Sequence, residues 1–137
     1  MKRLLACSIL ALTAACAATP AETARAAAAQ AGTAQRLNQS LAGYTAEPAQ
    51  DCLDNFQTRN ANIEAFGSTI LYKVNRNLIY RTDTGGGCEA LASDSYLVTV
   101  SPEGRLCRGD IARTIDRSAH IETGSCAMGA FVPYRKH

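Results

Sequence analysis

The sequence is poor in large aromatic and imidazole side chains. It has 137 residues, no tryptophan, three phenylalanines and two histidines. A chain with so few large side chains buries only a modest core, since a small domain leaves much of its surface in water. Because only His120 and His137 could supply imidazole, we expect no metal site. We expect no cofactor either.

An excess of charge of one sign is lacking as well. The formal net charge of +2 comes from Lys2 and Arg3, because the remaining basic residues are equal in number to the 12 acidic ones. A nucleic-acid-binding chain shows a basic block, so we expect no nucleic-acid partner. Acidic residues interleave with the arginines of the C-terminal half: Arg105, Arg108, Asp110, Arg113, Asp116, Arg117 and Glu122.

The apolar run near the N-terminus, Leu4–Leu12, is too short for a membrane-spanning helix, which needs about 20 apolar residues. It follows Lys2 and Arg3, and a short apolar run behind positive charges is typical of a cleavable export signal. We expect residues 1–15 to be this signal peptide.

The stretch Leu12–Cys16, LTAAC, resembles the lipobox of bacterial lipoproteins, in which a peptidase cuts before a cysteine that carries a diacylglycerol thioether. The resemblance implies that Cys16 is the lipid attachment site, acylated and held in the lipid bilayer. Two lipid signals suffice for stable attachment. Ala17, where aspartate would signal inner-membrane retention, favours the outer membrane, facing the periplasm. The alternative is a conventional cut after Ala18 or a later alanine, which gives a soluble periplasmic or secreted protein.

Four cysteines remain after Cys7 leaves with the signal peptide and Cys16 is acylated or cleaved away. In an exported chain an even number of cysteines forms disulfides, because the periplasm is oxidising. No pair has the two-residue spacing of a zinc knuckle or a thioredoxin-type redox site. We expect two structural disulfides, and the sequence leaves all three connectivities open. The four are Cys52, Cys88, Cys107 and Cys126.

The segment after the signal, residues 16–50, is rich in alanine and glutamine. Alanine favours helix, and Thr19–Pro20 and Gly43 are a plausible start and stop. Only Leu37 and Leu41 could form a buried stripe, and a helix that buries almost nothing is marginal in water. We therefore expect an Ala-rich tether that is partly helical or disordered, with a docking helix for a partner as the alternative.

Residues 51–137 carry apolar residues with the period of two that is typical of strands. Around Asn75–Asn77 this pattern predicts a hairpin, with Ile70, Tyr72 and Val74 on one face of its first strand. Several short strands separated by turns predict an all-β, disulfide-stapled antiparallel meander, with closure into a barrel or a sandwich left open. Further strands are expected at residues 62–66, 96–100, 111–115 and 127–132.

Three features of this domain could carry chemistry. We expect Asp110 to accept backbone N–H bonds in the turn after a strand. The run Gly85–Gly87 lacks the Lys-Ser/Thr of a phosphate loop, and we expect it to supply positive φ angles. Asp116, His120 and Ser125 are the residue types of a hydrolase triad, but Ser125 lies outside a Gly-x-Ser-x-Gly elbow. We expect these three to be solvated loop residues, and no residue to be catalytic.

Four segments of the domain occur in a characteristic order: Asp51-Cys52, Cys88-Glu89-Ala90-Leu91, LCRGD at residues 106–110 and GSCAMGAF at residues 124–131. Together they resemble a family of small exported proteins of Gram-negative bacteria that is described only as a domain of unknown function. The resemblance covers residues 50–137. It implies a cell-envelope location and a frame of four cysteines, and it implies no activity or substrate.

From these features we expect a cell-envelope lipoprotein that is not an enzyme. Its domain would be a binding or structural module facing the periplasm, with a periplasmic protein as partner. The alternative is a secreted, unanchored inhibitor or ligand-binding module, and a small hydrolase is the third interpretation.

Overall fold

The computed structural model describes residues 18–101 and 103–136. The chain divides into two units, Met1–Gly32 and Thr33–His137, and helix α1 (Pro20–Ser40) runs through the boundary between them. The expected signal peptide, residues 1–15, and the expected lipid attachment site, Cys16, lie outside the described residues.

Helix α1 begins at the residue that the sequence predicts. The N–H of Glu22 donates to the hydroxyl of Thr19 (3.3 Å), and the N–H of Thr19 donates to the carboxylate of Glu22 (2.8 Å). This reciprocal pair is a capping box, and its hydrogen bonds from Thr19 lower the pKa of Glu22. No residue of α1 is fully buried, while Leu37 and Leu41 are half-buried. Residues 20–40 of the segment expected to be a tether are helical.

The largest sheet contains five antiparallel strands in the order β1-β10-β5-β4-β3. β3, β4 and β5 form the expected meander, β10 returns from the C-terminal end to pair with β5, and β1 pairs with β10. β1 lies in the segment that we expected to be tether. The sequence did not predict it, because a two-residue strand carries no periodic pattern. The strands are β1 (Thr45–Ala46), β3 (Asn62–Phe66), β4 (Thr69–Asn75), β5 (Leu78–Asp83) and β10 (Phe131–Arg135).

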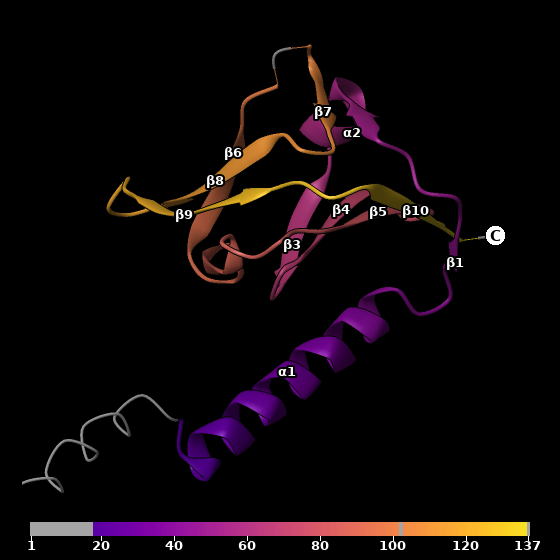
Figure 1. Cartoon of the computed structure of the whole chain (residues 1–137). Coiled ribbons are helices and arrows are strands. Elements are labelled where there is room, and N and C mark those ends of the chain that lie inside the picture. Colours follow the sequence, from indigo (N-terminus) through magenta and orange to yellow (C-terminus); the bar gives the residue numbers. More distant parts are fainter. Residues whose placement is uncertain (1–17, 102, 137) are drawn as a thin grey trace, which may run out of the picture. The chain divides into compact units, whose positions relative to one another are not determined.

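Two smaller antiparallel sheets accompany the large one (Figure 1), a pair β2-β7 and a three-stranded sheet β6-β8-β9. The short helix α2 (Asn55–Arg59) follows β2, and a 3₁₀ helix, η1 (Glu89–Ala92), precedes β6. The expected all-β antiparallel class is confirmed, and the described strands do not close into a barrel. The strands are β2 (Cys52–Asp54), β6 (Ser95–Thr99), β7 (Arg105–Cys107), β8 (Ile111–Asp116) and β9 (Glu122–Ala127).

The prediction of a strand at residues 127–132 is wrong, because β9 ends at Ala127 and β10 begins at Phe131. The residues between them are apolar for another reason. Met128 is buried, and its N–H and C=O bond to the turn that contains Gly109 and Asp110 (both 2.9 Å) instead of to a neighbouring strand. Its backbone groups are satisfied in a buried connection, so an apolar run here indicates burial and not a strand.

The core lies between one face of the five-stranded sheet and the two smaller sheets. Ile70 and Tyr72 point into it as predicted, and the ring of Tyr72 packs edge-on against that of Phe131, with centroids 6.2 Å apart. On the opposite face of the sheet Leu71 and Ile79 are buried as well. The core also takes in these residues: Leu53, Leu78, Tyr80, Leu106, Ala112 and Met128.

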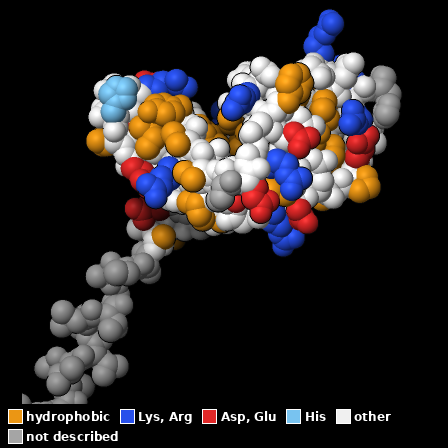
Figure 2. Space-filling view, turned by 90° about the horizontal axis from the view of Figure 1, so that it is seen from above, with side chains coloured by type: hydrophobic (Ala, Val, Ile, Leu, Met, Phe, Trp, Pro, Cys, Tyr) orange, Lys and Arg blue, Asp and Glu red, His pale blue; other side chains and the backbone are white. Residues whose placement is uncertain are grey.

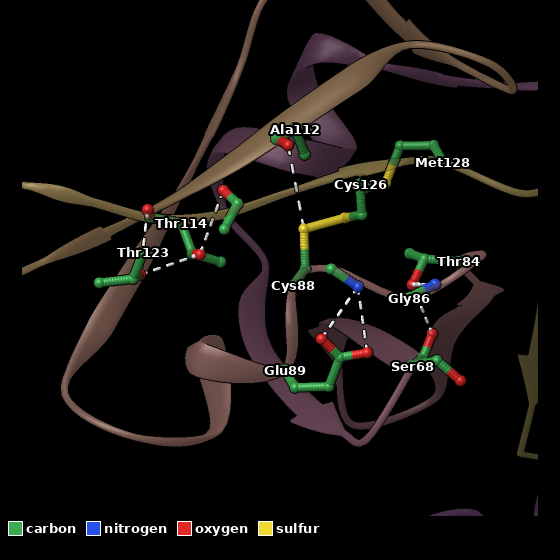
Figure 3. Close-up of a disulfide and its surroundings, with 12 residues drawn as sticks. Ser68, Thr84, Gly86, Cys88, Glu89, Ala112, Thr114, Thr123, Cys126 and Met128 are labelled. Carbon is green, nitrogen blue, oxygen red and sulfur yellow. Dashed lines mark hydrogen bonds between the residues drawn. A yellow bond between two sulfur atoms is a disulfide. The ribbon is translucent and has the colours of Figure 1, made fainter. Parts of the chain in front are cut away.

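The four cysteines form two disulfides, as expected, and the structure selects one of the three connectivities. Cys52 pairs with Cys107 directly across the β2-β7 ladder. Cys88, in the loop after β5, pairs with Cys126 of β9 (Figure 3). The second disulfide thus ties the loop that leaves the large sheet to an edge strand of the three-stranded sheet. The sequence separations are 55 and 38 residues, and the two loops interleave.

The glycines before Cys88 have the conformation that the sequence predicts, with φ of +100° at Gly86 and +98° at Gly87. The N–H of Gly87 donates to the carboxylate of Glu89 (2.9 Å). A Cβ built on Gly124 of β9 would overlap the carbonyl oxygen of Gly87. A Cβ on Gly87 would in turn overlap the carbonyl oxygen of Ser125. Glycine is therefore required at both Gly87 and Gly124, and this close contact lets the loop reach β9.

Candidate functional site

A pocket of about 190 Å³ opens between α2 and four strands, β3 and β4 of the large sheet, β6 and β7. Its walls come from segments far apart in the sequence, since α2 precedes the β3-β4-β5 meander, β3 and β4 belong to it, and β6 and β7 follow it. The lining residues are Thr58, Arg59, Ile63, Tyr72, Leu97, Thr99 and Leu106.

The floor of the pocket is apolar. Tyr72 and Leu106 belong to the buried core, and the half-buried Ile63 and Leu97 pack against them. The hydroxyl of Tyr72 donates to the sulfur of Met128 (3.8 Å), so this hydroxyl already has an acceptor within the core. Burial raises the pKa of Tyr72 well above its ordinary value. The tyrosine therefore stays neutral beneath the pocket that it lines.

Hydrogen bonds fix the position of helix α2 at the rim. The side-chain amide of Gln57 donates to the hydroxyl of Tyr80 (2.7 Å), and its oxygen accepts the N–H of Asp54 (3.1 Å). Gln57 thus ties the first turn of α2 to the five-stranded sheet. This contact holds the next two residues, Thr58 and Arg59, against the pocket.

The rim carries one cation and two hydroxyls. The guanidinium of Arg59 is exposed and has no ion-pair or hydrogen-bond partner within residues 18–101 and 103–136. The hydroxyl of Thr58 donates to the carbonyl of Asn55 (3.1 Å), whereas that of Thr99 has no partner in the same ranges. Arg59 and Thr99 are therefore the donors that an occupant of the pocket would meet.

The described lining residues of the pocket include no carboxylate, imidazole or thiol. Acid–base catalysis needs a group that exchanges a proton near the working pH, and nucleophilic catalysis by a threonine needs an adjacent base. The described walls supply neither of these groups.

The structure places Asp110 as the sequence predicts. Its carboxylate accepts the N–H of Cys107 (2.7 Å) in the turn after β7. This hydrogen bond closes the turn beside the Cys52–Cys107 disulfide, which gives Asp110 a structural role.

The three residues of the hydrolase interpretation are spread along the β8-β9 hairpin. Asp116 ends β8 and His120 follows the turn, in which the carboxylate of Asp116 accepts the N–H groups of Ala119 (2.7 Å) and Ser118 (2.9 Å). These hydrogen bonds, the one from Ala119 foremost, lower the pKa of Asp116. Ser125 lies in β9 opposite Arg113, three residues before Asp116 in β8 and thus about 10 Å along the ladder. Asp116 is accordingly an acceptor in a turn.

None of the candidate residues taken from the sequence lines the pocket. Arg59 was missed, because the segment Asn55–Arg59 shows no motif and its neighbours in the pocket come from distant strands. The apolar alternation in this strand, Tyr96, Val98 and Val100, indicated the opposite face of β6 from that of Leu97 and Thr99. These two residues face the pocket, whereas Val98 and Val100 are 39% and 69% exposed.

The surface carries charges of both signs, and Figure 2 shows basic and acidic side chains interspersed over the face that it presents. Among the described residues no three His, Cys, Asp or Glu side chains are grouped so as to hold a metal ion. No described helix is long and apolar enough to cross a membrane.

Comparison with family models, with curated proteins and with solved structures found no match for this chain.

Proposed function

We propose that this chain is a lipoprotein of the bacterial cell envelope whose disulfide-stapled β-domain serves as a non-catalytic binding module in the periplasm. The observation that carries the proposal is the pairing of all four cysteines of the β-domain, Cys52–Cys107 and Cys88–Cys126. Structural disulfides persist in oxidising compartments outside the cytoplasm, which agrees with the export signal expected at residues 1–15.

The lipobox-like stretch Leu12–Cys16 supports anchoring through an acylated Cys16. In this arrangement α1, which has no fully buried residue, serves as the tether between the bilayer and the β-domain. Ala17 after the acylated cysteine supports the outer membrane as the destination.

The pocket beside Arg59 supports a binding role for the domain, since its apolar floor and its donors at the rim are the composition of ligand sites. It also favours binding over catalysis, because the described lining residues supply neither a base nor a nucleophile with a partner. A protein of the periplasm remains the expected partner, and the pocket supplies one place at which it can be contacted.

Metabolic labelling with a radioactive fatty acid in a Gram-negative host tests the anchoring. We expect the intact chain to incorporate the label and to fractionate with the outer membrane, and the variant Cys16→Ala to carry no label. Cys7→Ala is the matched control, because it removes a cysteine of the signal peptide and should leave labelling unchanged. An intact chain that carries no label and is recovered in the soluble periplasmic fraction would favour the unanchored ligand-binding module.

A further inference from the structure

The pocket is sized for one compact apolar group. An apolar cavity of about 150 Å³ holds a molecule of benzene, and the pocket here has a volume of about 190 Å³. Its floor is lined by Tyr72, Ile63, Leu97 and Leu106. One aromatic ring, or a branched chain of about six carbon atoms, would therefore fill it.

The rim favours a polar group of negative charge on the same occupant, because its described residues place a cation and a hydroxyl there. Arg59 is a fixed positive charge without a partner in the described ranges, and a guanidinium pairs with a carboxylate through two parallel hydrogen bonds. The hydroxyl of Thr99 is free to donate to the same group. A single guanidinium matches a group with a single negative charge.

We propose that the pocket binds a monocarboxylate with a compact apolar body, the carboxylate at Arg59 and Thr99 and the apolar body against Tyr72 and Leu106. This inference rests on the proposed binding role of the domain, and it names the ligand class of that role. Two sources carry this chemistry, a small free acid and the C-terminal residue of a polypeptide.

Titration of the ¹⁵N-labelled mature chain with phenylacetate, followed by NMR, tests the proposal. We expect the amides of Ile63, Leu97 and Thr99 to shift together, with a dissociation constant on the order of 1 mM for a ligand of this size. N-acetyl-phenylalanine distinguishes the sources, because its acetamide group represents a preceding peptide bond. Tighter binding than that of phenylacetate assigns the site to a polypeptide C-terminus, and weaker binding assigns it to a free acid.

Two controls isolate the charge. Phenylacetamide keeps the ring and removes the negative charge, and Arg59→Gln removes the positive one. We expect each to weaken binding about fivefold, as for a charged pair that is open to solvent. Arg76→Gln is the matched variant, since Arg76 is exposed in the β4-β5 turn and does not line the pocket. It should leave the dissociation constant unchanged.

Three results would overturn the inference. These are the absence of shifts at the pocket up to about 20 mM ligand, shifts centred on another part of the domain, or equal affinities for phenylacetate and phenylacetamide. Because Arg59 is exposed, an unchanged melting temperature of Arg59→Gln separates loss of binding from loss of fold. Fatty-acid labelling of Cys16 is measured independently, so failure of anchoring and failure of this ligand class are distinguishable.

Discussion

Removal of the Cys88–Cys126 disulfide should destabilise the β-domain strongly. The double substitution Cys88→Ala/Cys126→Ala opens a loop whose ends are 38 residues apart in the sequence. In the chain-entropy model a crosslink of this span stabilises the folded state by about 4 kcal/mol, because it restricts the unfolded chain. A small domain is stable by only about 5–15 kcal/mol, so the loss is a large part of the total.

The other disulfide gives an internal comparison. The Cys52–Cys107 pair spans 55 residues, and the same model again gives about 4 kcal/mol, because the dependence on loop length is logarithmic. The two loops overlap between Cys88 and Cys107. With one crosslink in place the other closes a shorter effective path, so each double substitution removes less stability than it would from a chain with no other crosslink. Full reduction should therefore cost more than the sum of the two double substitutions.

Urea unfolding of the oxidised chain and the two double variants measures these differences. We expect the midpoints of both variants to fall, and the slope m to rise because the unfolded chain without one crosslink exposes more surface. A loss below about 1 kcal/mol for Cys88→Ala/Cys126→Ala would refute the reasoning, as would unchanged unfolding after complete reduction.

Three further changes test the loop approach, the hairpin turn and the helix cap. Gly124→Ala should destabilise the domain by about 2–4 kcal/mol in urea unfolding, because its Cβ would overlap the carbonyl of Gly87; Gly85→Ala, which has open space around it, should stay within about 0.5 kcal/mol, and equal effects would contradict the close approach. The carboxyl of Asp116 should titrate below its ordinary value of 3.8 in an NMR pH series. Its lowered folded pKa stabilises the turn above the unfolded pKa, and this contribution is lost as the pH falls through the folded value; a midpoint at or above 3.8 would argue against the turn hydrogen bonds. Thr19→Ala should cost α1 about 1 kcal/mol and lower the helical signal in circular dichroism, whereas an unchanged signal would show that the capping box contributes nothing.

Local patterns predicted much of the fold. The strand at residues 62–66, the hairpin around Asn75–Asn77 and the start of α1 follow from alternation, turn residues and a cap, which act within a few residues of the chain. The missed elements depend on distant partners. β1 exists because β10 pairs with it, and Met128 is apolar because it is buried in a connection.

The chemistry of the candidate site was less accessible from the sequence. Asp110 could be assigned to its turn because the turn is local. The pocket could not be predicted, because Arg59 and Thr99 are 40 residues apart and meet only where three sheets pack together. The cysteine pairing was open for the same reason, since sequence spacing alone does not choose among three connectivities.

The intact mass of the protein isolated from its native membrane, with and without reductant, tests the proposal of a disulfide-stapled lipoprotein most directly. The account predicts a chain that begins at Cys16, carries the added mass of an acylated glyceryl group, and gains about four hydrogens on reduction. A chain that begins after Ala18 or a later alanine and carries no lipid would contradict it, and the partner would then be sought in solution.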